Sequence, residues 1–355
     1  METQNNNRKL MILIVIAVGV IVLTWITVVS MGLTGQVSKK ETIKIGIITD
    51  LTGPAAYWGE SSRVGAEIAA EEMRKEGYDV ELIYEDYQLD ATKALSSAQK
   101  LVNIDNVDAI YAEFNPAAIS VGSFLKEKNV LFVYDAAVIS SLEGNDLAFK
   151  TYLDYKEGCK QVAEEFKEEG VNKLGVLKVN LEVGDLCVEG VKEVFPKAEV
   201  ESYNLGEQDF KTPLLKLTTK GIEAVTTVFF EGDTLNTLKV LREQDLNIRL
   251  GTVDDSITEK VRQMYTQELQ GTLSFGFRDV SPEFKEKIKD KKLATEYGAA
   301  ITYTHIKQMV SSLDKAKGDK KKLISKMENS LADDTIGFKG FTNHIAELEM
   351  KIKKY

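Results

Sequence analysis

The sequence predicts an α/β protein whose parallel sheets are distributed over two domains, and three observations support this fold class. The chain has 355 residues, which exceeds the size at which one hydrophobic core usually keeps growing, so two domains are expected. Hydrophobic residues make up 43% of the chain and charged residues 28%, a composition typical of globular proteins. Short apolar strands alternate with amphipathic helices along most of the chain, which indicates parallel sheets with right-handed crossovers.

The first strand, loop and helix occupy Ile43–Met73, and the rest of the chain is organised around this unit. The apolar run Ile43–Ile48 is typical of a strand buried on both faces, and Thr52–Pro54 ends it. Small residues in Gly65–Ala70 allow the following helix to approach a sheet closely. Ligands of open α/β sheets bind at the carboxyl ends of strands, so Leu51–Ser61 is expected to border a ligand site. The alternative is an ordinary connection without a ligand.

Strands and helices then follow in turn. The predicted strands are Val80–Glu85, Val107–Phe114, Val130–Asp135, Leu174–Val179, Val200–Leu205 and Ala224–Phe230. The predicted helices are Ala91–Asn103, Ala117–Lys128, Lys156–Glu169, Gly184–Phe195, Phe210–Lys220 and Thr234–Gln244.

Two extended segments interrupt this alternation, Leu147–Asp154 and Gln270–Arg278. The first of them suggests a crossover between domains. After the second, Tyr297–Leu313 has the periodicity of a helix, and His305 lies on its apolar stripe. This position favours a core histidine over a metal or ligand contact.

The N-terminal segment predicts a membrane anchor. No charged side chain occurs from Leu10 to Ser38, and the apolar part is long enough for a bilayer, which needs about 20 residues. A secretory signal has a shorter apolar region and a small-residue cleavage site, and Val29–Met31 matches such a site poorly. We therefore expect a cytoplasmic N-terminus at residues 1–9, a transmembrane helix at 10–31 and a linker at 32–41, with the remaining chain extracytoplasmic.

Charge and cysteine content limit the possible partners. A net charge of −10 argues against nucleic acid, which rewards a basic surface. The two cysteines, Cys159 and Cys187, lie far from the apolar segment, so no lipid-attachment cysteine is present where a bacterial lipoprotein needs one. They either form a disulfide outside the cell or remain separate buried thiols, and the sequence leaves this open.

Motifs of catalysis are absent from the sequence. The chain contains no nucleophile elbow, P-loop, dinucleotide fingerprint, zinc-protease helix or C-x-x-C pair. The two histidines, His305 and His344, lie in different contexts, which argues against histidine-based acid–base chemistry or a zinc site. Asp254-Asp255 is the one adjacent acidic pair considered for hydrolysis, but neighbouring residues usually point to different sides of the chain. We expect no enzymatic activity, no cofactor and no metal.

Loops that follow strands supply the residue types of a binding site. Trp58 lies in the first loop, Asn115-Pro116 follows the third strand, and Ala136–Ser141 follows the fourth. In the later half of the chain, similar positions belong to Val183–Asp185, Glu231–Asp233 and Asp254. All are expected near carboxyl ends of strands, where an aromatic wall and a few polar groups suffice for a small molecule.

The sequence resembles the type I periplasmic binding proteins of the branched-chain amino acid (leucine/isoleucine/valine) group that serve ABC transporters. The likeness runs from about Ile43 to the C-terminus and is strongest in IKIGIITDLTGPAAYWGESSRVGAEIAAEEM and LGEQDFKTPLLKLTTKGIEAVTTVFFEGDTLNTLKVLREQDL. The resemblance implies two Rossmann-like lobes joined by three crossovers near Asp154, Arg278 and Asp333. Lobe 1 would comprise 42–153 and 279–332, and lobe 2 would comprise 154–278 and 333–355.

The resemblance also implies roles for individual residues. Trp58 takes the place of the aromatic residue that lines the family's pocket, and Asp254 lies near the acid that binds the ligand ammonium. Other positions depart from the family: Pro116 or Ala117 replaces a carboxylate-binding Ser, Val138 a Thr, and Val183 a Tyr. Loss of both hydroxyls removes hydrogen bonds to a ligand carboxylate, although backbone amides near Ala117 and Ala136 are an alternative. The acids Glu113, Asp135, Glu231 and Asp233 would favour a cationic or polar ligand if they face inward.

The leading hypothesis is a membrane-tethered extracytoplasmic solute-binding protein that delivers a small amino acid-like or amide-like solute to an ABC transporter. Its expected partners are the solute, the permease subunits and the lipid bilayer. One alternative is a ligand-sensing ectodomain that acts with another membrane protein. The other is a relative that has lost ligand binding and serves a structural role, which the missing hydroxyls favour.

Overall fold

The computed structural model describes Met11, residues 15–25, 41–53, 55–204 and 207–355. The chain divides into two compact units at Glu41, and the fold presented here is that of the second unit, Thr42–Tyr355. In the first unit residues 15–25 are helical. Among the described residues, no helix has the length and apolar character needed to cross a membrane. Most of the predicted anchor and linker, and all of the predicted cytoplasmic N-terminus, lie outside the described residues.

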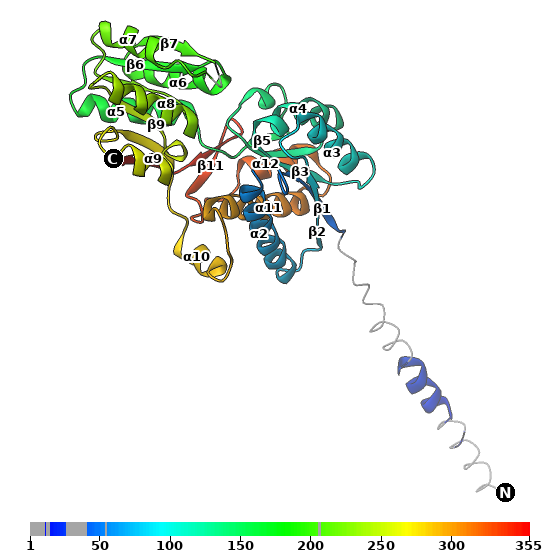
Figure 1. Ribbon diagram of the computed structural model, residues 1–355. Coiled ribbons are helices and arrows are strands. Elements are labelled where there is room, and N and C mark those ends of the chain that lie inside the picture. Colours follow the sequence, from blue (N-terminus) through cyan, green and yellow to red (C-terminus); the bar gives the residue numbers. More distant parts are fainter. Residues whose placement is uncertain (1–10, 12–14, 26–40, 54, 205–206) are drawn as a thin grey trace, which may run out of the picture. The chain divides into compact units, whose positions relative to one another are not determined.

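The second unit contains two sheets, and the first sheet has seven strands in the order β11-β12-β5-β4-β3-β1-β2 (Figure 1). Parallel pairing extends from β2 to β12, and β11 is antiparallel to β12. The elements of this lobe are β1 (Ile43–Thr49), α2 (Ala56–Lys75), β2 (Val80–Asp86), α3 (Ala91–Asn103), β3 (Ala109–Glu113), α4 (Phe114–Lys128), β4 (Leu131–Asp135), the short helix η1 (Ser140–Leu142), β5 (Ala148–Lys150), α10 (Pro282–Ile288), α11 (Glu296–Ala316), α12 (Lys320–Glu328), β11 (Phe338–Thr342) and β12 (Ile345–Leu348).

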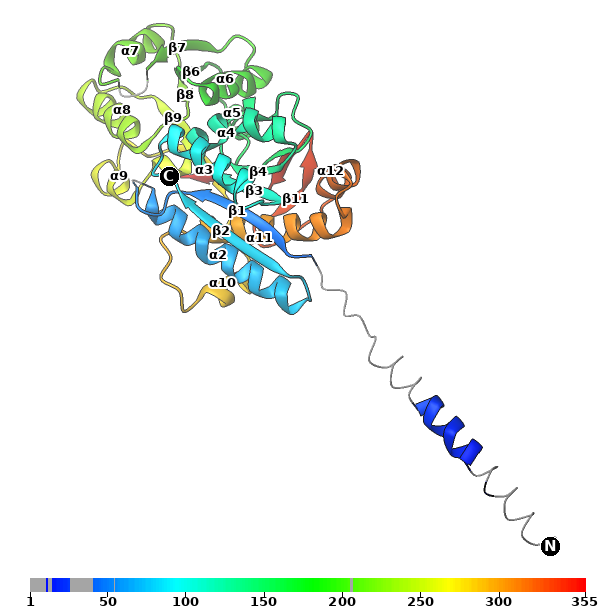
Figure 2. The same cartoon turned by 90° about the vertical axis from the view of Figure 1, so that its right-hand side faces the viewer.

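Helices cover both faces of the first sheet, as expected for buried parallel strands. Ile45 and Ile47 of β1 pack into the core formed with α2 and α11, whereas Ile48 packs into the core formed with α3 and α4. The helices α2 and α11 lie side by side (Figure 2). A Cβ at Gly65 would come within 1.9 Å of the Ala299 carbonyl oxygen of α11. The glycine is therefore required by contact between two helices, in addition to the predicted approach to the sheet.

The second sheet has six strands in the order β13-β10-β9-β8-β6-β7, and β13 is antiparallel to β10 while the other neighbours are parallel. Its elements are α5 (Tyr155–Glu168), β6 (Leu174–Val179), α6 (Glu182–Val194), β7 (Glu199–Tyr203), α7 (Lys211–Thr219), β8 (Ala224–Thr226), α8 (Glu231–Glu243), β9 (Arg249–Val253), the short helix η2 (Asp254–Ser256), α9 (Glu259–Met264), β10 (Leu273–Phe277) and β13 (Met350–Lys354). A disulfide between Cys159 of α5 and Cys187 of α6 joins adjacent helices and resolves the question that the sequence left open.

Within Thr42–Tyr355 the described chain passes between the two sheets three times. The first two passages, after β5 and after β10, lie near Asp154 and Arg278, where the family resemblance implied them; the first was also suggested by the extended segment Leu147–Asp154. The third was predicted near Asp333, and that position is wrong: β11 and β12 still belong to the first sheet, so the chain crosses at Glu349. The reason is packing. Phe338 and Phe341 of this hairpin contact the core formed with α2 and α11, and the ring centroids of Phe341 and Phe149 are 5.1 Å apart.

One smaller detail of the sequence prediction changed and another was confirmed. Helix α4 begins at Phe114, directly after β3, instead of at Ala117. Phe114 adopts a left-handed backbone conformation with φ 68°, which turns the chain sharply from strand into helix. His305 is confirmed as a core residue: it is fully buried, and burial lowers its pKa to about 4.

Candidate functional site

A cavity of about 210 Å³ lies between the two lobes, at the carboxyl ends of strands. We call it the inter-lobe cavity. Residues from α2, η2, the end of β10, the following crossover and the start of α11 line it: Trp58, Asp254, Asp255, Phe277, Arg278, Asp279, Val280, Thr295, Glu296 and Tyr297. A larger cavity of about 620 Å³ lies at the amino ends of β6 and β7 and is formed by one lobe only. We assign the site to the inter-lobe cavity because ligands of such folds bind at carboxyl strand ends.

Three aromatic side chains form one wall of the inter-lobe cavity. The ring centroid of Phe277 lies 3.6 Å from that of Tyr297 in a stacked arrangement and 6.5 Å from that of Trp58. Trp58 also contacts Phe114 at 6.2 Å. Since Phe277 comes from the second sheet and the others from the first lobe, the wall spans both lobes.

Local hydrogen bonds hold the loop that carries Trp58. The Asp50 carboxylate accepts hydrogen bonds from the backbone amides of Gly53 and Ala55, both at 2.6 Å. These contacts fold the chain back directly after β1, so α2 begins at Ala56 and Trp58 lies in its first turn. Trp58 is 9% exposed, and its Nε1 has no hydrogen-bond partner among the described residues.

The adjacent acids Asp254 and Asp255 both line the cavity, but their side chains have different partners. Oδ1 of Asp254 accepts hydrogen bonds from Ser274 at 2.7 Å and from the Tyr355 hydroxyl at 2.5 Å. Lys353 Nζ lies 3.7 Å from the same atom. Among the described residues, Asp255 Oδ2 accepts one hydrogen bond, of 3.2 Å, from the Tyr152 hydroxyl. Asp255 therefore has fewer partners within the described protein than Asp254, which was predicted to lie near the ammonium-binding acid.

Two further acids lie at the carboxyl ends of β3 and β4. Glu113 is fully buried, and desolvation raises its pKa to about 7, although polar groups of Ser62, Thr49 and Trp58 counteract the shift. Asp135 is 3% exposed, and burial followed by repulsion from Glu113 raises its pKa well above the usual value. Oε1 of Glu113 and Oδ1 of Asp135 have no hydrogen-bond partner among the described residues.

Amides in the loop after Ala136, one of the two predicted carboxylate-binding places, already have partners within the protein. Asn115 Oδ1 accepts a hydrogen bond from the Ala137 amide at 3.0 Å. Glu182, from α6 of the second lobe, accepts hydrogen bonds from the amides of Ile139 at 2.5 Å and Ser140 at 3.2 Å. These amides therefore hold a carboxylate of the protein itself, and this contact joins the two lobes.

Several predicted site residues do not line the inter-lobe cavity. Ala117, Ala136 and Val138 are buried in the core around α3 and α4, and Pro116 is half-buried in the first turn of α4. Val183 is buried in the second-lobe core. Glu231 lies at the start of α8, where Lys260 Nζ is 3.6 Å from its Oε1. Of the predicted residues, Trp58 and Asp254 are thus the ones that reach the cavity.

Phe277 and Tyr297, which line the cavity, and Glu182, which connects the lobes, were not predicted from the sequence. Phe277 ends an extended segment that was noticed only as an interruption, and Tyr297 begins a predicted helix. An aromatic residue at each side of a crossover was therefore a usable signal. Glu182 gave none, because its contact with Ile139 spans 43 residues of sequence. Among the described residues, no group of three or more His, Cys, Asp and Glu side chains is arranged to hold a metal ion.

Comparison with known proteins supports the two-lobed arrangement. The sequence profile of the family described as "Periplasmic binding protein" matches residues 42–352. A leucine-, isoleucine-, valine-, threonine- and alanine-binding protein of Pseudomonas aeruginosa is 27% identical over 210 residues, which cover 55% of each chain. This match therefore spans only about half of that relative. A Leu/Ile/Val-binding protein homolog of Brucella abortus is 23% identical over 295 residues, 77% of this chain and 78% of the relative.

Solved structures show the same fold. A leucine binding protein from Thermotoga maritima superposes with a TM-score of 0.72 at 18% identity, covering 88% of this chain and 95% of that protein. A solute binding protein of an ABC transporter from R. palustris, solved with 4-hydroxybenzoate, has a TM-score of 0.73 at 20% identity, covering 88% and 93%. At such identities the likeness establishes the fold and leaves the ligand open.

Proposed function

The chain belongs to the type I periplasmic binding proteins of the branched-chain amino acid group, and from this premise we propose that it binds a small solute between its lobes for delivery to an ABC permease. The observation that carries the proposal is the inter-lobe cavity, to which both lobes contribute side chains. The segments that connect the two sheets can act as a hinge, so that the two lobes close around a ligand. Closure would trap the solute and present both lobes to the permease subunits.

A change in Trp58 fluorescence emission when a solute is added is the most direct test of solute binding. The full chain with Trp25→Phe contains Trp58 as its only tryptophan, because the sequence has two. We expect a true solute to change Trp58 emission and to raise the melting temperature, with about 2.7 kcal/mol of stabilisation at a hundredfold excess over the dissociation constant. A panel of amino acids, amides, amines and small aromatic acids that produces neither response would contradict the proposal.

We also propose that the N-terminal apolar run tethers the binding domain to the membrane. Its support is the sequence alone, in which Leu10–Ser38 carries no charge. The test is fractionation of cells that make the full chain. Retention in the membrane fraction after carbonate and high-salt washes, with release by detergent, is the expected result. Release by carbonate alone would contradict the tether.

A further inference from the structure

Two residues that line the inter-lobe cavity, Trp58 and Tyr297, are 9% and 8% exposed, and neither Trp58 Nε1 nor Tyr297 Oη has a geometric hydrogen-bond partner among the described residues. At the neighbouring strand ends Glu113 Oε1 and Asp135 Oδ1 are likewise buried without such a partner, although Trp58 lowers the pKa of Glu113. Buried polar groups are nearly always hydrogen-bonded, so the Tyr297 hydroxyl in particular is available to a ligand. Three of the four atoms accept or can accept hydrogen bonds, which favours a ligand rich in donors.

Negative charge from both lobes converges on the same place. Repulsion from Asp255 of the second lobe contributes to the raised pKa of Asp135 in the first, and both acids contribute to the raised pKa of Tyr297. Asp255 is exposed to the cavity, yet protein atoms surround it closely enough for desolvation to raise its carboxyl pKa. The arrangement keeps acids near one another at an energetic cost that a bound cation would remove.

The nearby basic side chains are committed to other groups. Lys150 is fully buried, and its Nζ donates hydrogen bonds to the carbonyl oxygens of Tyr152 and Leu153, both at 2.8 Å. Arg278, the one base among the cavity-lining residues, pairs with Asp334 at 3.1 Å and Glu349 at 2.8 Å. Neither supplies the counter-charge for Asp255.

A ligand carboxylate has no evident place in this site. The amides of Ile139 and Ser140 hold the carboxylate of Glu182. An anionic group would also lie near Asp255 and Asp135. Leucine-like zwitterions and benzoate-like anions are therefore poorly matched.

We propose that the inter-lobe cavity binds a small organic cation without a carboxylate, such as a primary amine or an amidine on a compact apolar body. This inference rests on the proposed function and specifies its ligand class. The cationic head lies against Asp255 and donates to the unpartnered Tyr297 hydroxyl. The apolar body packs on the wall of Trp58, Phe277 and Tyr297, whose aromatic faces attract cations. A cavity of about 210 Å³ limits the ligand to a molecule below drug size.

The experiment compares molecules that share a skeleton and differ in charge. The probes are isoamylamine, leucine and isocaproate, together with para-hydroxybenzylamine and 4-hydroxybenzoate. Each is added to the full chain with Trp25→Phe, and Trp58 emission and melting temperature are recorded. We expect responses from the two amines and none from the other three at equal concentration. This comparison needs no change in the site, so it stays decisive even if a site variant folds poorly.

A pair of variants then locates the cation. Asp255→Asn should raise the dissociation constant for the amines by about tenfold to a hundredfold, as expected for loss of a charge-assisted hydrogen bond. Glu243→Gln is the control, because it neutralises an acid of the same lobe that does not line the cavity and is 3.8 Å from Lys239 on the surface. It should change the constant by less than about twofold, as for other exposed ion pairs.

The possible outcomes separate this inference from the proposed function. Binding of leucine, isocaproate or 4-hydroxybenzoate without binding of the amines overturns the cationic ligand and leaves solute binding intact. No response to any probe or to the wider panel overturns both. Amine binding that Asp255→Asn leaves unchanged overturns the assignment of Asp255.

Discussion

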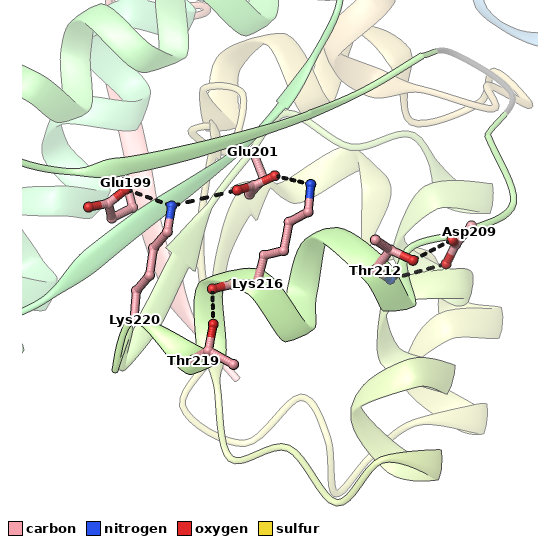
Figure 3. Close-up of polar contacts among 7 residues, drawn as sticks. All are labelled: Glu199, Glu201, Asp209, Thr212, Lys216, Thr219 and Lys220. Atoms are coloured by element: carbon pink, nitrogen blue, oxygen red, sulfur yellow. Dashed lines mark hydrogen bonds and ion pairs between the residues drawn. The ribbon is translucent and has the colours of Figure 1, made fainter.

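Acidic side chains at the cavity-facing edge of the first lobe differ in their partners from those on the outer edge of the second lobe. On β7, Glu199 lies 2.9 Å from Lys220 Nζ, and Glu201 lies 3.1 Å from Lys216 Nζ, as Figure 3 shows. At the carboxyl ends of β3 and β4, by contrast, Glu113 and Asp135 are buried, and Glu113 Oε1 and Asp135 Oδ1 have no hydrogen-bond partner among the described residues, although attraction to the buried Lys150 partly lowers the pKa of Asp135.

The two groups of acids are expected to differ in how much they change the free energy of unfolding. Solvent-exposed acids near lysines change the stability of the fold little in either direction, because water screens both charges. Buried acids without a cation oppose folding, since desolvation penalises the charged form. The second lobe also carries the disulfide, whereas the first lobe has no cysteine. We infer that the first lobe retains unfavourable charge for ligand binding and that the second lobe provides much of the stability.

The largest effect is expected from removal of the Cys159–Cys187 disulfide. The cross-link closes a loop with a sequence separation of 28 residues, for which the chain-entropy relation gives about 3.5 kcal/mol. The double change Cys159→Ala and Cys187→Ala should lower the free energy of unfolding by this order, measured by urea denaturation. Reduction of the unmodified chain serves as the control. An unchanged free energy would show that the second lobe does not depend on its cross-link.

The change Glu113→Gln tests the cost of the buried acid. The folded pKa of about 7 lies above the usual Glu value of 4.5, so the folded state binds more protons than the unfolded state between these pH values. Stability contributed by the protonated form is present below pH 4.5 and is lost as pH rises through about 7. At about pH 8 the Gln variant should therefore be more stable by roughly 2–3 kcal/mol, and at about pH 4 the two chains should be similar.

Urea denaturation at both pH values measures this difference. Contributions of groups that do not interact with Glu113, including the buried His305, are common to both chains and cancel. The contribution of Asp135 does not cancel, because Glu113 repels it, and loss of this repulsion stabilises the variant in the same direction at the higher pH. Gln can still accept the hydrogen bond that the Thr49 hydroxyl donates to Glu113. A variant that is less stable at the higher pH would contradict the view that the charged form of Glu113 is unfavourable in the fold.

An intermediate effect is expected from Glu182→Gln at the contact between lobes. The charged acceptor for the amides of Ile139 and Ser140 is lost, which should weaken the contact by about 1–2 kcal/mol. Faster hydrogen exchange of these two amides is the measurement. Glu189→Gln is the matched control, because Glu189 lies on the same helix and only approaches Lys156 at 3.5 Å. Equal exchange in both variants would argue against a closing role for Glu182.

The smallest effect is expected on the outer edge of the second lobe. Lys220→Met removes the partner of Glu199 and Glu201, yet the melting temperature should remain the same within error, because exposed ion pairs contribute little. Differential scanning calorimetry at low and high salt measures it. A clear loss of stability would break the contrast between the two regions, since the paired surface acids would then matter as much as the buried ones.

Much of the fold was predictable from local patterns. The apolar run in Ile43–Ile48 indicated a strand buried on both faces, and the structure places Ile45 and Ile48 in cores on opposite sides of the sheet. The extended segments before Asp154 and Arg278 marked two passages between sheets. The third passage was misplaced, because the hairpin β11–β12 joins the first sheet through contacts with Phe149 that no local pattern records.

The sequence by itself determined the α/β alternation, the family resemblance and Trp58 as a wall of the site, because these depend on side-chain periodicity and local turns. Only the tertiary structure decided that both Asp254 and Asp255 line the cavity, that Lys353 approaches Asp254 while Asp255 has no ion-pair partner in the described part of the chain, and that Glu182 of one lobe holds amides of the other. The physical reason is distance along the chain. Side-chain partners, burial and charge balance are set by residues that meet only after both lobes have folded.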